Sequence, residues 1–170
     1  MSLKIKKILI LFILFLIPNV VFGNESLKSI GKFKDWETFT MTENENKVCF
    51  AQSIPILQAP KKTEREARLF VTFRSVDKIQ DEVSVTAGYV FNDKNKVTAK
   101  SGKTVLIFST VQENFAWFKE NKTEKKLIKV LKKGSRLMVA GYNIQGSQTI
   151  DHYSLLGFRK AYSAAKKSCS

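Results

Sequence analysis

Short runs of alternating apolar and polar residues recur along most of the chain. The clearest run, EVSVTAGYVF, places Val83, Val85, Ala87, Tyr89 and Phe91 on one face and small polar residues on the other. One buried and one solvated face is typical of a strand in an antiparallel sheet. Similar patterns predict further strands at 36–42, 47–53, 68–76, 97–99 and 104–111, and a hairpin over 136–158 with its turn at 145–147.

Two segments change to the helical period. The segment TEKKLIKVLKKG begins with Thr123, a predicted N-cap, ends at Gly134, and repeats apolar residues at Leu127, Ile128 and Leu131. Its other side is rich in lysine. The C-terminal segment has apolar residues on one face of a final helix, at i, i+3, i+4, i+7 and i+11: Phe158, Ala161, Tyr162, Ala165 and Cys169.

Several short strands and two short helices favour a mainly β fold, an antiparallel β-sandwich with helical additions. We expect one domain over 35–170, after a polar lead-in at 24–34. The segment 54–66 contains two prolines and is expected to be a loop, whereas FAWF at 115–118 is either a further edge strand or a buried loop. Gly88 and Gly141 lie inside expected strands, which predicts a bulge or a close backbone approach at each.

The first 23 residues have the pattern of a secretory signal. Lys4, Lys6 and Lys7 precede an unbroken apolar run at 8–17, and we expect cleavage after Gly23. An uncleaved anchor helix is the alternative, but this apolar run is about half of the roughly 20 residues that span a bilayer. No cysteine stands at the junction to accept a lipid. The protein is therefore expected to be periplasmic or secreted.

The predicted mature chain has two cysteines, Cys49 and Cys169. An even number of cysteines in an exported protein is normally oxidised, so we expect an intramolecular disulfide between them. Two thiols so far apart, with a single histidine in the chain, form neither a zinc site nor a CxxC redox pair. No metal or cofactor is expected.

The chain is strongly basic. Without the three signal lysines, 26 basic residues face 15 acidic ones, a net charge of +11 that attracts anionic surfaces. A solvated basic surface is the simpler interpretation. If the two helices lie on one side, however, they form a tentative anion-binding patch from nine residues: Lys125, Lys126, Lys129, Lys132, Lys133, Arg159, Lys160, Lys166 and Lys167.

Outside the cytoplasm, the available polyanions are lipopolysaccharide, anionic phospholipid and acidic polymers. An anionic lipid surface is therefore a candidate partner for the basic patch. Nucleic acid is not expected, because single-stranded nucleic acid is bound by exposed aromatic side chains beside the lysines, and the sequence shows none there.

The chain resembles the invasion-associated locus B family of exported bacterial proteins over nearly all of its predicted mature length. The resemblance rests on the order and spacing of seven segments: FKDWETF (33–39), KVCFAQS (47–53), FVTFR (70–74), DEVSVTAGYVF (81–91), AW (116–117), LKKGSRLMVAG (131–141) and TIDHYSLLGFRKA (149–161).

The resemblance implies an immunoglobulin-like β-sandwich in the periplasm or at the cell surface, with no assigned catalytic activity or cofactor. The chain departs from the family pattern at two positions. Ser75 stands where the family commonly has proline, and His152 stands where it has a small polar residue.

The segment TIDHYSLL contains the residue types of a hydrolytic triad. In a strand, however, Asp151 and Tyr153 point to one face while His152 and Ser154 point to the other. Asp151 is therefore not placed to orient His152, and the chain has no second histidine and no G-x-S-x-G motif. We interpret His152 as a solvent-facing strand residue and expect a non-enzymatic protein.

Other polar residues have structural interpretations. The acidic pairs Asp35/Glu37, Glu64/Glu66 and Asp81/Glu82 lie beside lysine or arginine, so they are interpreted as local charge balance. Tyr89 and Tyr153 alternate with apolar neighbours, which predicts core packing with a satisfied hydroxyl. The leading functional hypothesis is an envelope or cell-surface interaction module with an unidentified partner. The alternative is a binder of anionic envelope components through the basic helices.

Overall fold

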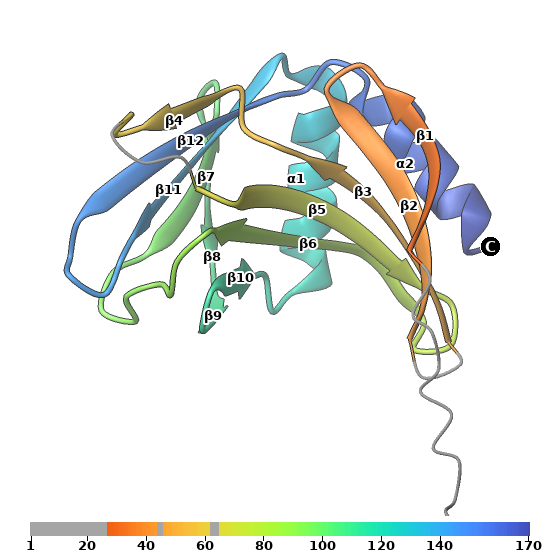
Figure 1. Cartoon of the computed structure of the whole chain (residues 1–170), viewed down its shortest axis with the longest axis horizontal. Coiled ribbons are helices and arrows are strands. Elements are labelled where there is room, and N and C mark those ends of the chain that lie inside the picture. Colours follow the sequence, from red (N-terminus) through yellow and green to blue (C-terminus); the bar gives the residue numbers. More distant parts are fainter. Residues whose placement is uncertain (1–26, 44–45, 62–64) are drawn as a thin grey trace, which may run out of the picture.

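Two antiparallel sheets form the fold in the computed structural model, which describes residues 27–43, 46–61 and 65–170 (Figure 1). The predicted signal sequence lies outside the described residues. The larger sheet has the order β1 (Lys28–Phe33), β2 (Trp36–Glu43), β3 (Asn46–Ser53), β5 (Ala67–Arg74), β6 (Ile79–Ala87), β10 (Phe115–Trp117) and β9 (Thr110–Gln112). The smaller has the order β4 (Leu57–Ala59), β12 (Gln148–Ser154), β11 (Arg136–Tyr142), β7 (Val97–Ser101) and β8 (Thr104–Phe108).

The inner faces of both sheets carry the alternating apolar residues. On β5 and β6, Leu69, Val71, Val83 and Val85 are fully buried, and Leu137 of β11 faces them from the smaller sheet. Side chains between them point outward, as the period of two requires. The mainly β sandwich predicted from the sequence is confirmed.

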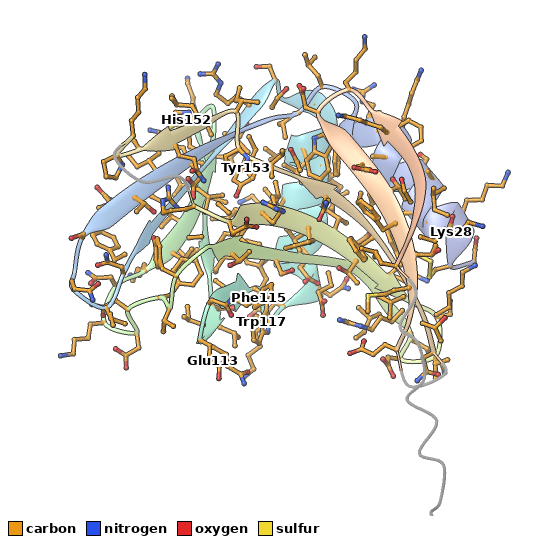
Figure 2. All side chains as sticks on the ribbon, viewed as in Figure 1. Lys28, Glu113, Phe115, Trp117, His152 and Tyr153 are labelled. Carbon is orange, nitrogen blue, oxygen red and sulfur yellow. A yellow bond between two sulfur atoms is a disulfide. The ribbon has the colours of Figure 1, made fainter. Side chains whose placement is uncertain are left out.

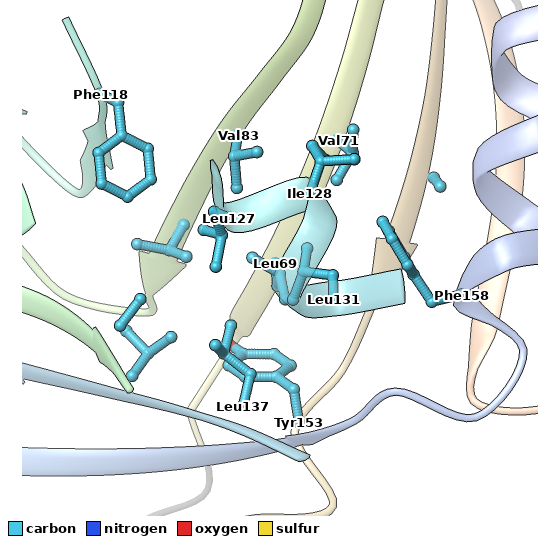
Figure 3. Packing of buried hydrophobic residues seen from close by; sticks show 14 of the residues in the cluster. Leu69, Val71, Val83, Phe118, Leu127, Ile128, Leu131, Leu137, Tyr153 and Phe158 are labelled. Atoms are coloured by element: carbon cyan, nitrogen blue, oxygen red, sulfur yellow. The ribbon is translucent and has the colours of Figure 1, made fainter. Parts of the chain in front are cut away.

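Helix α1 (Asn121–Lys133) lies between the two sheets. Figure 3 shows Leu127, Ile128 and Leu131 among residues of the larger sheet on one side and Leu137 and Tyr153 of the smaller sheet on the other. This apolar stripe matches the predicted one, and the helix ends at Gly134 as expected. Thr123 is not the N-cap, however, because the helix begins at Asn121 and Glu120 occupies the cap position.

Helix α2 (Phe158–Ser168) covers the inner face of β2 and β3 at the end of the larger sheet that α1 leaves open. The ring of Phe158 packs edge-on against Trp36 with centroids 4.8 Å apart, and the Thr38 hydroxyl donates to the Ala161 carbonyl at 3.0 Å. The predicted disulfide between Cys49 and Cys169 is present and fastens the end of α2 to β3.

Two strands lie where none was expected. Residues 28–33 of the predicted lead-in form β1, which pairs with β2, and residues 57–59 of the predicted loop form β4, which pairs with the edge of β12. Both strands have mostly exposed or half-buried side chains, so backbone pairing rather than an apolar pattern defines them. The short aromatic segment at 115–117 is strand β10, paired on both sides.

Strand β6 is shorter than predicted and ends before Tyr89. Gly88 has a φ of +76°, and a Cβ there would lie 2.7 Å from the Glu66 backbone nitrogen. The chain therefore turns away at a point where only glycine avoids both strain and a backbone clash. At Gly141, a Cβ would lie 2.6 Å from the Phe91 ring. Both glycines mark close approaches, as predicted.

The two helices of the described part of the chain are too short or too polar to cross a membrane.

Candidate basic interface

A hollow of about 690 Å³ lies beside α1, at the end of the smaller sheet where the β7–β8 turn and the start of β11 meet the helix. Lys126, Lys129 and Lys133 line it from α1, and Arg136 lines it from β11. We call it the α1 hollow. Its remaining walls are small or apolar: Ser101, Gly102, Val130, Gly134 and Ser135.

The helical period produces the lysine row of the α1 hollow. Lys126, Lys129 and Lys133 follow at i, i+3 and i+7, so they share the face opposite Leu127 and Leu131. All three lysines are exposed, while both leucines are 1% exposed. Burial of the apolar face against two sheets therefore fixes the direction in which the lysines point.

Strand pairing brings Arg136 to the same place. After α1 ends, Gly134 adopts an extended backbone and donates its N–H to the Val130 carbonyl at 2.8 Å, and the chain enters β11. The Ser101 hydroxyl donates to the Arg136 carbonyl at 2.8 Å, which holds the β7–β8 turn against the start of β11. Arg136 was not predicted as a site residue, because its position depends on the pairing of β11 with β7.

The α1 hollow is uniformly cationic: none of its described lining residues is a carboxylate. Three ammonium groups and one guanidinium can donate several charge-assisted hydrogen bonds to one anionic group. The guanidinium adds a planar fork that matches the oxygens of a phosphate or carboxylate. The arrangement is therefore suited to an anionic ligand of phosphate size or larger.

The two helices do lie on one side of the larger sheet and touch each other. The Arg159 Nε donates to the Lys132 carbonyl, and the Lys132 ammonium lies 3.8 Å from the centre of the Tyr162 ring. Lys132 and Arg159 therefore join α1 to α2 through a cation–π contact and a hydrogen bond at a helix C-terminus. Both take part in packing in addition to carrying charge.

The remaining predicted basic residues divide into two groups. On α1, Lys125 is exposed together with the three lysines of the α1 hollow. On α2, Lys160, Lys166 and Lys167 are exposed, and Lys166 lines a separate, smaller hollow beside Cys169. The structure thus places five of the nine predicted residues on α1 and four on α2. The contacts of Lys132 with Arg159 and Tyr162 lie between the two groups.

The Asp-His-Ser segment is strand β12, and its side chains alternate as predicted. Asp151 is buried on the inner side. The Arg65 guanidinium donates hydrogen bonds to both of its carboxylate oxygens, at 2.6 and 3.0 Å, and another to the Ala87 carbonyl at 2.9 Å. Burial raises the pKa of the Asp151 carboxyl, and the hydrogen bonds and charge of Arg65 oppose that rise. His152 points to the other side of the strand, half-buried rather than fully in solvent.

Arg65 was missed from the sequence because it lies in a segment expected to be a loop, with no pattern that points to Asp151. Tyr89 fits its prediction, since its hydroxyl bonds to the Thr149 hydroxyl at 2.6 Å. Tyr153 does not. Its buried hydroxyl has no hydrogen-bond partner among the described residues, so the expectation of a satisfied hydroxyl is wrong there. Figure 2 shows His152 and Tyr153 on the smaller sheet.

The predicted charge balance is present for two of the acidic pairs. Glu66 pairs with Arg68 at 3.0 Å, and Glu82 pairs with Arg74 at 3.0 Å. Asp81 instead accepts a hydrogen bond from the Tyr162 hydroxyl at 2.6 Å. Glu64 lies outside the described residues.

Comparison with known proteins agrees with the sequence and the fold. The crystal structure of invasion associated protein B from Bartonella henselae is similar to this chain, with a TM-score of 0.56 and 16% sequence identity, over 83% of this chain and 98% of that one. At this identity the likeness shows the fold. None of the curated proteins compared with the chain matches it. The sequence profile of the family described as invasion associated locus B (IalB) protein matches residues 36–166. The chain therefore belongs to the invasion associated locus B family.

Proposed function

We propose that this protein is an exported, non-enzymatic module of the cell envelope or cell surface, and that it associates with anionic envelope components through the α1 hollow. The ligand class is a phosphate-bearing or carboxylate-bearing surface, such as anionic phospholipid or lipopolysaccharide. Export rests on the N-terminal signal pattern, with its lysines before an apolar run at 8–17.

The observation that carries this proposal is the convergence of four cations on one hollow without a described carboxylate. In the free protein this arrangement is unfavourable. Lys126 and Lys129, and Lys129 and Lys133, are like-charged pairs at helical spacing, and each costs about 0.2–0.5 kcal/mol. An anionic group bound in the hollow would replace that repulsion with attraction.

The non-enzymatic part of the proposal is supported by β12. Asp151 is held by Arg65 on the inner side of the strand, whereas His152 lies on the outer side. The pair therefore lacks the carboxylate-to-imidazole hydrogen bond that a catalytic triad uses. We expect His152→Ala to leave envelope binding unchanged.

The test is cosedimentation of the secreted, processed protein with vesicles of phosphatidylglycerol, of lipopolysaccharide, and of neutral phosphatidylcholine, over a salt series. We expect binding to the two anionic vesicles alone, and its loss at high salt. The triple variant Lys126→Gln/Lys129→Gln/Lys133→Gln should bind about 100-fold more weakly, at about 1 kcal/mol per basic residue near an anionic surface.

The matched control is Lys160→Gln/Lys166→Gln/Lys167→Gln on α2, which removes the same charge from exposed positions. It should retain most of the binding. Equal losses in the two triple variants would contradict a role for the α1 hollow and leave overall charge as the cause. No binding at low salt would contradict envelope association altogether.

A further inference from the structure

The outer face of the larger sheet carries a row of aromatic side chains that crosses its strands. Phe39 of β2 stacks on Phe50 of β3 at 5.4 Å between ring centroids, Phe50 meets Phe70 of β5 at 5.9 Å, and Phe70 meets Phe115 of β10 at 6.3 Å. Trp117 stands opposite Ser84 in the same row of strands. The solvent-facing side of a sheet is ordinarily polar, so this apolar row indicates a surface that binds another molecule.

A groove of about 450 Å³ runs along this row. We call the residues that line it the aromatic face: Met41, Glu43, Val48, Phe50, Phe70, Thr72, Arg74, Glu82, Ser84, Phe115 and Trp117. Figure 2 shows Phe115 and Trp117 side by side on β10. Protein interfaces are enriched in aromatic residues, methionine and arginine and depleted in lysine. The described lining of the aromatic face has this composition and contains no lysine.

The charge of the aromatic face differs from that of the rest of the chain, and this difference favours one kind of partner. The predicted mature chain carries a net charge of +11, whereas the aromatic face has one arginine and two glutamates, a net charge of −1. Arg74 and Glu82 already pair at 3.0 Å, so burying them together leaves no lone charge. Two copies of so basic a protein repel each other, and this repulsion is smallest when the surfaces in contact carry little positive charge. An anionic surface, in contrast, gains nothing from this face.

We propose that the aromatic face binds the same face of a second copy of the chain, in a two-fold symmetric dimer. In such a contact the same surface of both copies is used: residue i of one copy meets residue j of the other, and residue j meets residue i. Five neighbouring strands spaced at about 4.8 Å, with a mean length of roughly 20 Å, cover about 500 Å² in projection. Two copies therefore bury about 1,000 Å², close to the minimum area of a biological interface and typical of a weak dimer.

The dimer goes beyond the proposed envelope binding and is independent of it. Strand alternation places the aromatic face on one side of the larger sheet, while Thr38 and Cys49 on the other side bond to α2. Both helices pack on the inner face of the larger sheet, so a contact through the aromatic face does not cover them. Such a dimer would carry two α1 hollows, one on each copy.

Sedimentation velocity of the secreted, processed protein tests the proposal between about 1 and 100 µM, the range of a moderate dimer affinity. We expect the dimer fraction to rise across this range. Collisional quenching gives a second readout, because Trp36 is 1% exposed and quenching therefore reports Trp117. Quenching should fall as the dimer forms.

Two variants and one control make the test specific. Phe115→Glu, at a position that is 38% exposed, and Ser84→Lys, between the strand partners Phe70 and Trp117, should each raise the dimer dissociation constant at least tenfold. Ser84→Lys removes no aromatic packing, so it remains informative if Phe115→Glu folds poorly. Ile107→Glu, at a 45% exposed position on the smaller sheet, should leave the dimer unchanged.

A protein that stays monomeric at about 100 µM, or a dimer that Ile107→Glu disrupts and Ser84→Lys does not, would overturn the proposal. Shielding of Trp117 by neutral phosphatidylcholine vesicles in a monomeric protein would likewise overturn it and identify an acyl chain as the occupant. The salt dependence of binding to anionic vesicles tests the α1 hollow separately from these three results.

Discussion

The guanidinium of Arg65 and the carboxylate of Asp151 form a two-pronged ion pair that joins the two sheets. Arg65 precedes β5 of the larger sheet, and Asp151 lies within β12 of the smaller one. The side chains of Arg65 and Asp151 are 9% and 2% exposed, so both charges are poorly hydrated. Each group therefore depends on the other for its charge partner.

Arg65→Met should destabilise the protein by about 3–5 kcal/mol, because it leaves the Asp151 charge buried and unpaired. Urea unfolding of the oxidised protein measures this change. The double variant Arg65→Met/Asp151→Leu should recover much of the loss, since it removes both charges. Arg68→Met is the control. Its partner Glu66 is exposed, so the cost should stay below about 1 kcal/mol. Similar costs for Arg65→Met and Arg68→Met would contradict this account.

The disulfide between Cys49 and Cys169 closes a loop of 120 residues. The chain-entropy account assigns about 4–5 kcal/mol of stabilisation to a loop of this length. We expect Cys49→Ala/Cys169→Ala to lower the free energy of unfolding by about this amount, and reduction of the natural protein to have the same effect. Unfolding curves with and without reductant check both. Unchanged stability in the double variant would show that packing alone holds α2 in place.

Local patterns predicted those elements whose side chains alternate between core and solvent. The buried faces of β5 and β6, the apolar stripe of α1 and the buried face of α2 are all visible as periods of two or of about 3.6. The disulfide followed from there being only two cysteines. In contrast, β1 and β4 are defined by backbone hydrogen bonds at sheet edges, and such pairing leaves no side-chain pattern.

The candidate site was predictable in part for the same reason. Lys126, Lys129 and Lys133 follow from the helical period, whereas Arg136 joins them only through the order of strands in the smaller sheet. Arg65 and the aromatic row likewise depend on contacts between residues far apart in the chain. In sequence, Phe50 and Phe70 read as members of separate strands, and only strand order places them side by side.

Gly157 should be the most sensitive glycine of those with positive φ. It stands at the N-cap of α2 with a φ of +91°, and a Cβ there would lie 1.7 Å from the Phe33 carbonyl oxygen. Gly157→Ala therefore combines backbone strain with a clash against β1 and should cost about 3 kcal/mol or more. Thermal unfolding monitored by circular dichroism measures the loss.

Gly102→Ala provides the matched comparison for Gly157. Gly102 also has a positive φ, +55°, but a Cβ there meets nothing within 4 Å. Its replacement should cost only the backbone strain, about 1 kcal/mol. The difference between the two variants isolates the contact with Phe33. Equal losses would mean that β1 shifts freely and does not constrain the start of α2.

We expect the free energy of unfolding to depend on pH through the carboxyl of Glu124. It lies buried in the first turn of α1, where its Oε1 accepts the Val83 N–H at 3.2 Å. Burial raises the pKa of Glu124 from 4.5 to about 7; the Val83 N–H opposes this rise, and the charges of Glu82 and Asp81 add to it.

Because the folded pKa of Glu124 exceeds the unfolded one, the folded protein binds the extra proton between pH 4.5 and about 7. The stabilisation that protonated Glu124 contributes is complete below pH 4.5 and is lost as the pH rises through about 7.

Glu124→Gln tests this pH dependence, because glutamine keeps an acceptor for the Val83 N–H but cannot ionise. The Tm of the variant minus that of the natural protein should therefore rise between pH 4.5 and about 7 and stay constant at higher pH. The expected rise is about 3–6 °C, which corresponds to about 1–2 kcal/mol after allowance for solvent screening. A Tm difference that does not change between pH 4.5 and 8 would show that Glu124 is already ionised in the folded state at the lower pH.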